Sequence, residues 1–443
     1  MNCIFICVFN NENYVNMLSL LLESLYIYGN MNENIQILIY TTTNFRNKII
    51  KSHLTSKYIN FEINDSYNTI DSACKSRLNL FTLKSISKYN KILYLDTDIL
   101  IKGDINKIFD VVKEDILYVL EEGTIDSDSD FWGKSLFGNE INNYVDKSAF
   151  TSGILLFNNC VKIKELFQKI NTHLTRNNNI GFHDQPYIVY NAFKYNLYNN
   201  KILKSYVVNN DDNIHSNKNI HHFPGGPGVY ETKIEKMQIF LKGLKEYATN
   251  LNIQITKKYI NRHLSFISNN VENNIFMEKN SNYENKAKNI SSIILNKNIQ
   301  NILEIGFNTD FSTILMLLSN TKIKITCLDL NDNNDNNDTI LSFYKQLKDM
   351  FGDKINIIND LKNVKEKFDL IHIYSNHLYL NDLYNFLKKG TIIIYNIPIL
   401  NSTNSTNYNK LWNNCISQYN VQFFNLPLHK TNLHDIKYVS NIA

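Results

Sequence analysis

The chain contains 443 residues, of which 43% are hydrophobic and 20% charged, and its 46 basic and 42 acidic residues leave a formal net charge of +4. This length exceeds that of an ordinary single domain, and the apolar content suffices for a hydrophobic core in each of two domains. The basic residues do not form a run that could follow a phosphate backbone. Nucleic acid is therefore excluded as an expected partner.

The apolar first ten residues have no basic segment before them, are too short to span a bilayer and are followed at once by polar residues. They predict a buried first strand, and no other stretch predicts a membrane span. Six cysteines are scattered without C-x-x-C spacing, so neither a disulfide framework nor a zinc site is indicated. We expect a protein of the reducing cytoplasm.

In the first half of the chain, short β-branched runs alternate with amphipathic stretches. A helix is predicted over residues 14–29 and another over 230–251. This alternation predicts a parallel sheet covered by helices, and hence an α/β domain over residues 1–250. The predicted strands are 3–9, 35–40, 58–63, 91–95, 116–123, 152–159 and 205–210.

The second half begins with an Asn-rich segment, residues 251–284, which we interpret as a connector with helical parts. A second alternating series then predicts another doubly wound α/β domain over residues 285–443. Its predicted strands are 301–306, 323–330, 355–360, 368–374 and 391–396. The polar tract 331–338 is interpreted as a solvated loop.

Two aspartates, Asp96 and Asp98, follow the predicted strand 91–95. Ligands of open α/β sheets bind at the carboxyl ends of strands. Strand alternation directs both carboxylates to one side and Thr97 to the other, so that the pair can share a divalent cation such as Mg²⁺ or Mn²⁺, which in turn suits a diphosphate. An isolated D-x-D is at least as often a solvated turn, so context must decide.

The segment His221–Gly228, "HHFPGGPG", supplies that context, because it holds two of the five prolines and three of the 14 glycines of the chain. The backbone N–H groups of residues such as Gly225 and Gly226 can close around an anion, and a preceding histidine offers a nitrogen to a metal. A glycine-rich turn beside a buried histidine is the alternative. The presence of D-x-D in the same predicted domain favours a site for metal and diphosphate.

These two motifs, "YLDTD" and "HFPG", resemble the D-x-D and H-x-x-G motifs of glycosyltransferase family 8, the family of glycogenin and of lipooligosaccharide galactosyltransferases. The resemblance implies a GT-A-like nucleotide-sugar-binding fold and Asp96, Asp98 and His222 as ligands of Mn²⁺. It also implies a retaining transfer of a hexose from a UDP-sugar to a hydroxyl of a glycan, a small molecule or a protein. A catalytically silent nucleotide-sugar-binding module is the alternative function.

Further segments resemble the family in the same order, over roughly residues 1–245. In "FHDQPYIVYN", Asp184 and Gln185 are implied as the catalytic residues that face the reacting sugar carbon. Where family members often carry a lysine after H-x-x-G, this chain has Gly228, so that Lys233, Lys218 or the glycines alone would contact the diphosphate. The implied donor-binding residues are Val8, Asn10, Asn11, Tyr14, Arg77, Thr97, Ser152, Gly225 and Gly226, with Gly153 also close to the sugar.

Residues from about 285 to 425 resemble class I S-adenosylmethionine-dependent methyltransferases, which implies a Rossmann-like fold. Glu304 and Gly306 lie at a predicted strand-to-helix turn and Asp329 ends the next strand, where a carboxylate commonly pairs with a ribose hydroxyl. The resemblance implies these three residues as the S-adenosylmethionine site.

This second resemblance has departures. Gly306 is the one glycine of its turn, and Tyr374 and Asn396 stand where metal-dependent relatives carry acids, so metal-dependent methyl transfer is not expected. Two interpretations carry equal weight: a metal-free methyltransferase, and a degenerate domain that serves structure, homodimerisation or acceptor binding. His372 and His377 are candidate bases, but single histidines beside strands are more often structural.

Overall fold

The computed structural model describes most of the chain, and it divides the protein into two compact units, residues 1–244 and 245–443. The described residues are 1–51, 58–176, 181–225, 229–263, 281–296, 299–306, 311–320, 322–328, 337–358, 360, 364, 366–373, 386, 391–396, 420–423 and 434–441.

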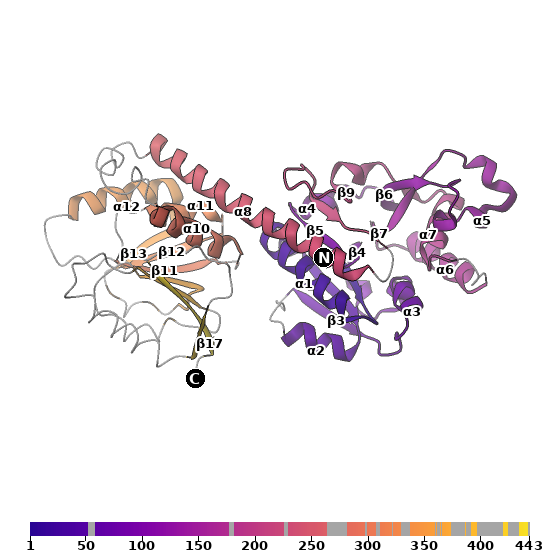
Figure 1. Ribbon diagram of the computed structural model, residues 1–443, viewed down its shortest axis with the longest axis horizontal. Coiled ribbons are helices and arrows are strands. Elements are labelled where there is room, and N and C mark those ends of the chain that lie inside the picture. The colour runs from indigo at the N-terminus through magenta and orange to yellow at the C-terminus, as the bar shows by residue number, and fades with distance from the viewer. Residues whose placement is uncertain are drawn as a thin grey trace. The chain divides into compact units, whose positions relative to one another are not determined.

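A seven-stranded mixed sheet forms the centre of the N-terminal unit (Figure 1). Its strands, in spatial order, are β3 (Ile59–Ile63), β2 (Ile35–Thr41), β1 (Asn2–Val8), β4 (Lys91–Leu95), β7 (Ser148–Asn158), β6 (Leu117–Thr124) and β8 (Tyr198–Asn199). The first four run parallel, as predicted, whereas β7 is antiparallel to both β4 and β6. The expectation of a wholly parallel sheet is therefore wrong, because β6 and β7 follow each other without a helix that crosses over the sheet.

Hydrophobic side chains bury both faces of this sheet. Along β1, Cys3 and Phe5 contribute to one core and Ile4 and Ile6 to the other, as alternation along a strand requires. The helices around the sheet are α1 (Glu12–Tyr28), α2 (Thr43–Lys51), α3 (Ile70–Lys75), α4 (Asn106–Asp110), α5 (Lys134–Phe137), α6 (Val161–Arg176) and α7 (Gln185–Lys194).

Helix α1 illustrates how the sequence sets these elements. The Asn11 side chain accepts a hydrogen bond from the Asn13 N–H and caps the helix, and Leu18, Leu21 and Leu25 recur on one face that packs on the sheet. Before β4, by contrast, helical structure is short and irregular: α3 is followed by two 3₁₀ segments, Ser76–Thr82 and Ile86–Lys88.

A small sheet positions one of the predicted metal ligands. It consists of β5 (Ile99–Ile101), β10 (Ile220–His222) and β9 (Val207–Asn209), with β10 antiparallel to β5 and parallel to β9. The register pairs His222 with Ile99, the residue after Asp98. Two segments more than a hundred residues apart in the chain are thereby joined at the D-x-D motif.

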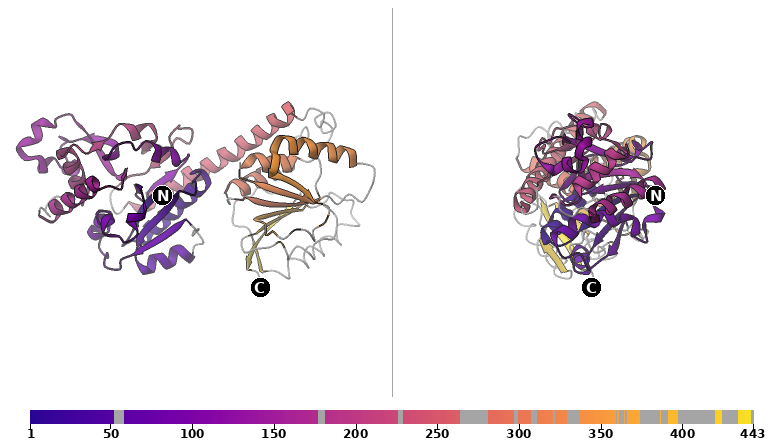
Figure 2. Two further views of the ribbon diagram at one scale, coloured as in Figure 1. Left: turned by 180° about the vertical axis from the view of Figure 1, so that it is seen from behind. Right: turned by 90° about the vertical axis from the view of Figure 1, so that its right-hand side faces the viewer.

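The C-terminal unit has a seven-stranded sheet of its own (Figures 1 and 2). In spatial order its strands are β13 (Ile355–Ile358), β12 (Lys324–Leu328), β11 (Asn301–Ile305), β14 (Leu370–Ile373), β15 (Ile392–Asn396), β17 (His434–Asn441) and β16 (Asn420–Phe423). All are parallel up to β15, and β17 is antiparallel to both of its neighbours. The helices are α10 (Ser281–Asn296), α11 (Phe311–Ser319) and α12 (Asn337–Phe351).

Helix α8 (Tyr230–His263) is longer than the predicted helix 230–251 and contributes to the cores of both units. Phe240 and Leu244 pack with Met17 of the N-terminal unit, and Ile253 packs in the core of the C-terminal unit. Residues 264–280 of the predicted connector lie outside the described part of the chain. Among the helices that are described, none has the length and hydropathy needed to cross a bilayer.

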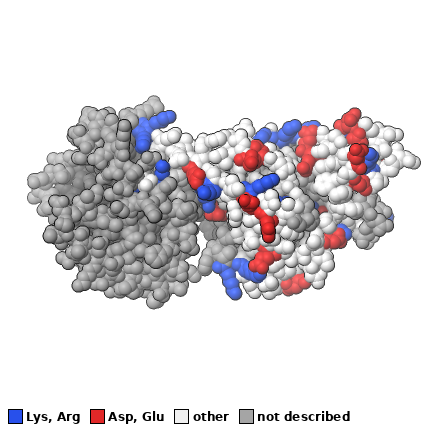
Figure 3. Space-filling model, viewed as in Figure 1, with Lys and Arg blue, Asp and Glu red and all other residues white. Residues whose placement is uncertain are grey.

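Charged side chains are mixed on the surface of the N-terminal unit. Figure 3 shows lysine and arginine interspersed with aspartate and glutamate on the face that it presents. On that face, the described residues form no contiguous basic patch of the kind that nucleic-acid binding requires.

Candidate active site

A cleft of about 570 Å³ lies where β1 and β4 end. In the spatial order β3-β2-β1-β4, these adjacent strands mark the point where the order along the chain reverses, which is where open α/β sheets bind ligands. The predicted site residues that line the cleft are Tyr14, Arg77, Asp96, Thr97, Asp98, Ser152, Gly153, Asp184, Gln185, His222, Gly225 and Lys233.

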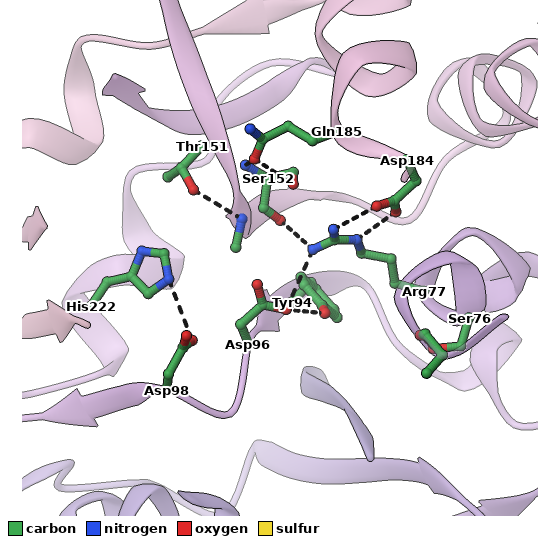
Figure 4. A network of polar contacts seen from close by, with 12 residues as sticks. Ser76, Arg77, Tyr94, Asp96, Asp98, Thr151, Ser152, Asp184, Gln185 and His222 are labelled. Atoms are coloured by element: carbon green, nitrogen blue, oxygen red, sulfur yellow. Dashed lines mark hydrogen bonds and ion pairs between the residues drawn. The ribbon is translucent and has the colours of Figure 1, made fainter. Parts of the chain in front are cut away.

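Asp96, Asp98 and His222 come together in this cleft (Figure 4), with their ligand atoms all within 4.8 Å of one another. Strand β4 ends at Leu95 and residues 97–98 form a bend, so the aspartates converge through this bend and not through strand alternation. Thr97 accordingly lines the cleft as well. The His222 Nδ1 lies 2.9 Å from the Asn209 Oδ1, which leaves its Nε2 to face the Asp98 Oδ1 at 3.4 Å.

These three residues fit a divalent cation. The Asp98 Oδ1 is buried, and no donor among the described residues lies closer to it than the His222 Nε2 at 3.4 Å. A Cβ added to Gly153 would lie 2.9 Å from both the Asp96 Oδ2 and the His222 Nε2, so both atoms border the same small space. Two carboxylate oxygens and one imidazole nitrogen are a ligand set that suits Mn²⁺ and accommodates Mg²⁺.

Two side chains fix the orientation of Asp96. The Tyr94 hydroxyl donates a hydrogen bond to the Asp96 Oδ1, and the Arg77 Nη1 lies 3.3 Å from the same oxygen. The Arg77 guanidinium also lies over the Tyr94 ring, 5.1 Å from its centroid. With Oδ1 held in this way, Oδ2 is the oxygen that remains for a metal.

Arg77 also holds Asp184. Its Nε and Nη2 donate to the two carboxylate oxygens of Asp184 at 2.7 and 2.8 Å, and its Nη1 donates to the Ser152 carbonyl at 2.8 Å. The Asp184 carboxylate is 1% exposed, so this bidentate pair is buried. It also explains why Asp184, at the N-cap position of α7, makes no side-chain cap.

Gln185 opens helix α7 with Pro186 beside it, a residue suited to the first turn of a helix. Its Oε1 accepts hydrogen bonds from the Ser152 N–H at 3.1 Å and the Ser152 hydroxyl at 2.9 Å. Its Nε2 is buried with no hydrogen-bond partner in the part of the chain that is described. An unpaired amide group that lines a cleft is available to a bound ligand.

Burial and charge act together on the metal-ligand candidates. Burial alone would raise the pKa of Asp98, but the hydrogen bond and charge of His222 and the charge of Lys233, whose Nζ lies 2.7 Å from the Asp98 Oδ2, lower it. Burial alone would lower the pKa of His222, but the hydrogen bond and charge of Asp98 raise it. Burial raises the pKa of Asp96. The result is a carboxylate-rich site with cationic neighbours.

Several predicted donor-binding residues have other contacts in this structure. Val8 is buried in the core, and its carbonyl accepts a hydrogen bond from the Thr41 hydroxyl at 2.7 Å. Asn11 caps α1, and Asn10 has a left-handed backbone with φ of 68°. Of the two candidate lysines, Lys233 lines the cleft, whereas Lys218 donates to the carbonyl of Lys204. Gly226 lies outside the described residues.

Other cleft residues were not anticipated from the sequence. They are Cys7, Phe9, Ala73, Cys74, Tyr94, Glu122, Phe131, Thr151, Phe182, His183 and Pro224. The sequence could have indicated Tyr94 and Glu122 as cleft residues, because both lie in or at the end of a predicted strand that leads to the cleft. Burial raises the pKa of the Glu122 carboxyl. Phe131 and Phe182 carried no such signal.

In the C-terminal unit, the predicted cofactor residue Glu304 is enclosed by its own sheet and helix. Its Oε2 accepts a hydrogen bond from the Thr313 hydroxyl at 2.8 Å and lies 3.6 Å from the Cys327 sulfur, and its Oε1 lies 3.1 Å from the His372 Nδ1. Gly306 follows β11 with φ of 83°. Asp329, Tyr374 and His377 fall outside the residues that the structure describes, and of Asn396 only the backbone is described.

The model of the family described as "Glycosyl transferase family 8" matches residues 3–226, just over half of the 443-residue chain. No curated protein matches the chain.

Several glycosyltransferases are among the solved structures that are similar to it. The galactosyltransferase LgtC in complex with donor and acceptor sugar analogues is 15% identical over 55% of this chain and 96% of its own, with a TM-score of 0.41. The WbbM bifunctional glycosyltransferase is 15% identical over 55% of this chain, with a TM-score of 0.39, and the match spans 51% of its own length. Mouse xyloside xylosyltransferase 1 is 10% identical over 50% of this chain and 97% of its own, with a TM-score of 0.38.

Proposed function

The chain belongs to glycosyl transferase family 8 and is a glycosyltransferase, and on that premise we propose that it transfers a hexose from a UDP-sugar to a hydroxyl acceptor with retention of configuration and with Mn²⁺ or Mg²⁺. One observation carries this proposal. The metal-ligand candidates Asp96, Asp98 and His222 lie within 4.8 Å of one another, in the cleft that also contains Asp184 and Gln185.

In this proposal Asp96, Asp98 and His222 hold the cation, and the aspartates do not transfer protons. When bound, the cation supplies a positive charge that stabilises the leaving diphosphate. Lys233, already 2.7 Å from the Asp98 Oδ2, is the lysine that supplies a second positive charge near the diphosphate. Lys233 would thereby make the contact with the diphosphate that relatives often make with a lysine at the position of Gly228.

The side-chain contacts of Asp184 and Gln185 indicate a different role for each residue. Both Asp184 oxygens are occupied by Arg77, so Asp184 positions Arg77 and, through it, Asp96. Gln185 lines the cleft, its buried Nε2 has no hydrogen-bond partner among the described residues, and Ser152 fixes its Oε1. Gln185 is therefore the group that contacts the sugar near its reacting carbon, on the face where the acceptor hydroxyl approaches.

The test measures UDP release from a panel of UDP-hexoses with Mn²⁺, with Mg²⁺ and with a chelator, for the wild type and Asp98→Asn. We expect metal-dependent release that falls by roughly a thousandfold in Asp98→Asn. Asp110→Asn, an exposed acid at the end of α4, is the matched control and should keep wild-type release. Unchanged release by Asp98→Asn would contradict the proposal, and UDP-sugar binding without release or transfer would favour the silent binding module.

For the C-terminal unit, we infer a methyltransferase-like domain in which Glu304 stabilises the sheet and does not bind a cofactor. The parallel order β13-β12-β11-β14-β15 supports a Rossmann-like sheet, whose ligand site would lie between β11 and β14. Glu304 on β11 and His372 on β14 pair with each other at that place. Calorimetry of the full chain with S-adenosylmethionine tests this inference: binding that Glu304→Gln abolishes would contradict it.

A further inference from the structure

Asn209 contacts the imidazole of His222 at the ring nitrogen that does not face Asp98. The parallel register of β9 and β10 pairs Asn209 with His222, and the Asn209 Oδ1 lies 2.9 Å from the His222 Nδ1. The other ring nitrogen, Nε2, faces the Asp98 Oδ1 (Figure 4). Asn209 is not among the described residues that line the cleft. Any effect of Asn209 on a bound cation must therefore pass through His222.

The position of one proton on the neutral imidazole of His222 decides which of its nitrogens can bind a metal. A side-chain carbonyl oxygen only accepts hydrogen bonds, so the Asn209 Oδ1 requires this proton on Nδ1. The Nε2 then has a free lone pair. If the Asn209 amide nitrogen faced the ring instead, the proton would lie on Nε2, where it would donate to Asp98 and prevent metal binding.

Glu122 selects between these two orientations of the Asn209 amide. Burial raises the pKa of the Glu122 carboxyl, whereas the charge of His222 and hydrogen bonds from the Thr151 and Asn209 side chains lower it. A hydrogen bond that lowers the pKa of a carboxyl group is one that the carboxylate accepts. Because a carboxylate has no proton to donate, Asn209 turns its NH₂ group to Glu122 and its Oδ1 to His222.

The same carboxylate is connected to the other side of the proposed metal site. The Thr151 Oγ1 accepts a hydrogen bond from the Gly153 N–H at 3.2 Å (Figure 4), and the Gly153 carbonyl accepts one from the Asp96 N–H at 2.9 Å. Glu122 on β6 is thus linked through Thr151 on β7 to Asp96, and through Asn209 on β9 to the histidine ligand candidate.

We propose that Asn209 is a positioning residue which, held by Glu122, fixes His222 in the tautomer with its proton on Nδ1. This inference rests on the metal site of the proposed function. Its consequence is a preference for transition-metal ions over Mg²⁺, because Mg²⁺ favours oxygen ligands and gains little from an imidazole nitrogen. Contacts that orient a histidine ligand in this way commonly change metal affinity by about 10- to 100-fold.

Metal affinity of the full-length protein tests the proposal without any turnover. Calorimetric titrations with Co²⁺, Mn²⁺ and Mg²⁺ compare the wild type with Asn209→Leu. We expect Mn²⁺ binding to weaken by roughly thirtyfold, Co²⁺ binding by more, and Mg²⁺ binding by less than about threefold, in the order in which these ions favour nitrogen. Equal losses for all three ions would indicate a merely structural role and overturn the proposal.

Asn60→Leu is the matched control for these titrations. Asn60 is likewise a half-buried asparagine on a short strand, and its amide donates to the Gln36 Oε1 at 2.9 Å. It is not among the described residues of the cleft, and its replacement should leave all three affinities at the wild-type values.

A charge exchange provides a second variant if Asn209→Leu does not fold. In the double change Asn209→Asp with Glu122→Gln, the new carboxylate accepts from the His222 Nδ1–H and the new amide donates to that carboxylate. Net charge and the direction of every hydrogen bond are kept, so Mn²⁺ affinity should stay within about threefold of the wild type. Loss of Mn²⁺ affinity by roughly thirtyfold in the double variant would overturn the proposal.

The tautomer of His222 can also be observed without a metal. Long-range ¹H–¹⁵N spectra are recorded at pH 9, well above the ordinary pKa of imidazole, on protein labelled at its eleven histidines. His222→Gln identifies the signals of His222 by difference. We expect the proton on Nδ1 in the wild type and the double variant, and on Nε2 in Asn209→Leu. A proton on Nε2 in the wild type would contradict the proposal.

Failure of this inference and failure of the proposed function give different results. UDP release by the wild type, with wild-type metal affinities in Asn209→Leu, would retain the transferase and overturn the role of Asn209. Ion-selective loss of binding in Asn209→Leu, without UDP release from any UDP-hexose by the wild type, would retain the role of Asn209 and remove the transferase.

Discussion

The two units of this protein share one feature of strand order and differ in the contacts that polar side chains make there. In each, the first strand of the unit lies beside its fourth, β1 beside β4 and β11 beside β14, so that the strand order reverses there. In the N-terminal unit, this edge carries carboxylates that line an open cleft, and the buried Gln185 Nε2 has no hydrogen-bond partner among the described residues. In the C-terminal unit, Glu304 and His372 pair with each other at the corresponding strands.

The difference shows that an acid on such a strand is informative only when its hydrogen-bonding partners are known. Glu304 is 2% exposed and His372 is 0% exposed, and their contacts come from Thr313 and from the sheet itself. Such a network stabilises a fold. Buried polar atoms without a partner are instead expected where a ligand completes the contacts. Four changes test this contrast.

The largest effect is expected for Arg77→Met. This change leaves the buried Asp184 carboxylate without its bidentate partner, which costs about 4 kcal/mol. We expect hydrogen exchange to accelerate in the N-terminal unit and to stay unchanged in the C-terminal unit, together with loss of UDP release. Arg46→Met, an exposed arginine over the Phe61 ring, is the control. Normal stability of Arg77→Met would show that the Arg77–Asp184 pair does not hold the site.

His372→Ala tests the C-terminal network. Removal of the imidazole leaves the buried Glu304 Oε1 without this partner, so we expect hydrogen exchange at β11 and β14 to report a loss of about 3 kcal/mol. UDP release should stay at the wild-type rate. The double change Glu304→Leu with His372→Leu should recover part of the stability, because it removes the buried carboxylate together with its partner and leaves the Thr313 hydroxyl as the group that loses its acceptor. A protein destabilised equally by the double change would argue against a mainly structural pair.

Gly153→Ala tests the space between the metal-ligand candidates. The new methyl group would meet the Asp96 Oδ2 and His222 Nε2 at 2.9 Å, so we expect Mn²⁺-dependent UDP release to fall by roughly thirtyfold while the unit remains folded. Gly243→Ala is the matched control, because the nearest atom to its added Cβ lies 3.5 Å away, at an ordinary contact distance. Wild-type Mn²⁺ affinity in Gly153→Ala would place the cation elsewhere.

The smallest effect concerns Glu121 on β6, which is adjacent to the cleft residue Glu122. Hydrogen bonds from Lys201 and Ser148 lower the pKa of Glu121 from 4.5 to about 2. A lowered pKa stabilises the fold above pH 4.5, and this contribution is lost as the pH falls toward 2.

Because the lysine partners of Glu121 are exposed, solvent screening reduces the contribution to about 1 kcal/mol. Urea unfolding should therefore show Glu121→Gln less stable than wild type by that amount at pH 7, with a smaller difference at pH 3. A difference that grows as the pH falls would contradict the assignment.

The sequence by itself determined the alternation of strands and helices in both halves, since hydrophobic periodicity follows from which faces are buried. It also determined that Asp96 and Asp98 follow a buried strand, where ligands bind, and the two motifs in order led to the family that the comparison confirms. These features are local: each depends on residues close to one another along the chain. The position of His222 beside them followed only from the family resemblance.

Only the tertiary structure decided the contacts between distant segments. The direction of β7 depends on how its connection to β6 runs, which periodicity does not encode. The pairing of Arg77 with Asp184 joins residues 107 positions apart, and the ring contact of Phe131 with Phe182 joins a 3₁₀ segment to a distant bend. Glu304 and Asp98 look alike in the sequence, as acids in or after apolar strands. Their surroundings differ: Thr313 and His372 contact the Glu304 carboxylate within its own unit, whereas Asp98 lines a cleft together with His222 and Lys233.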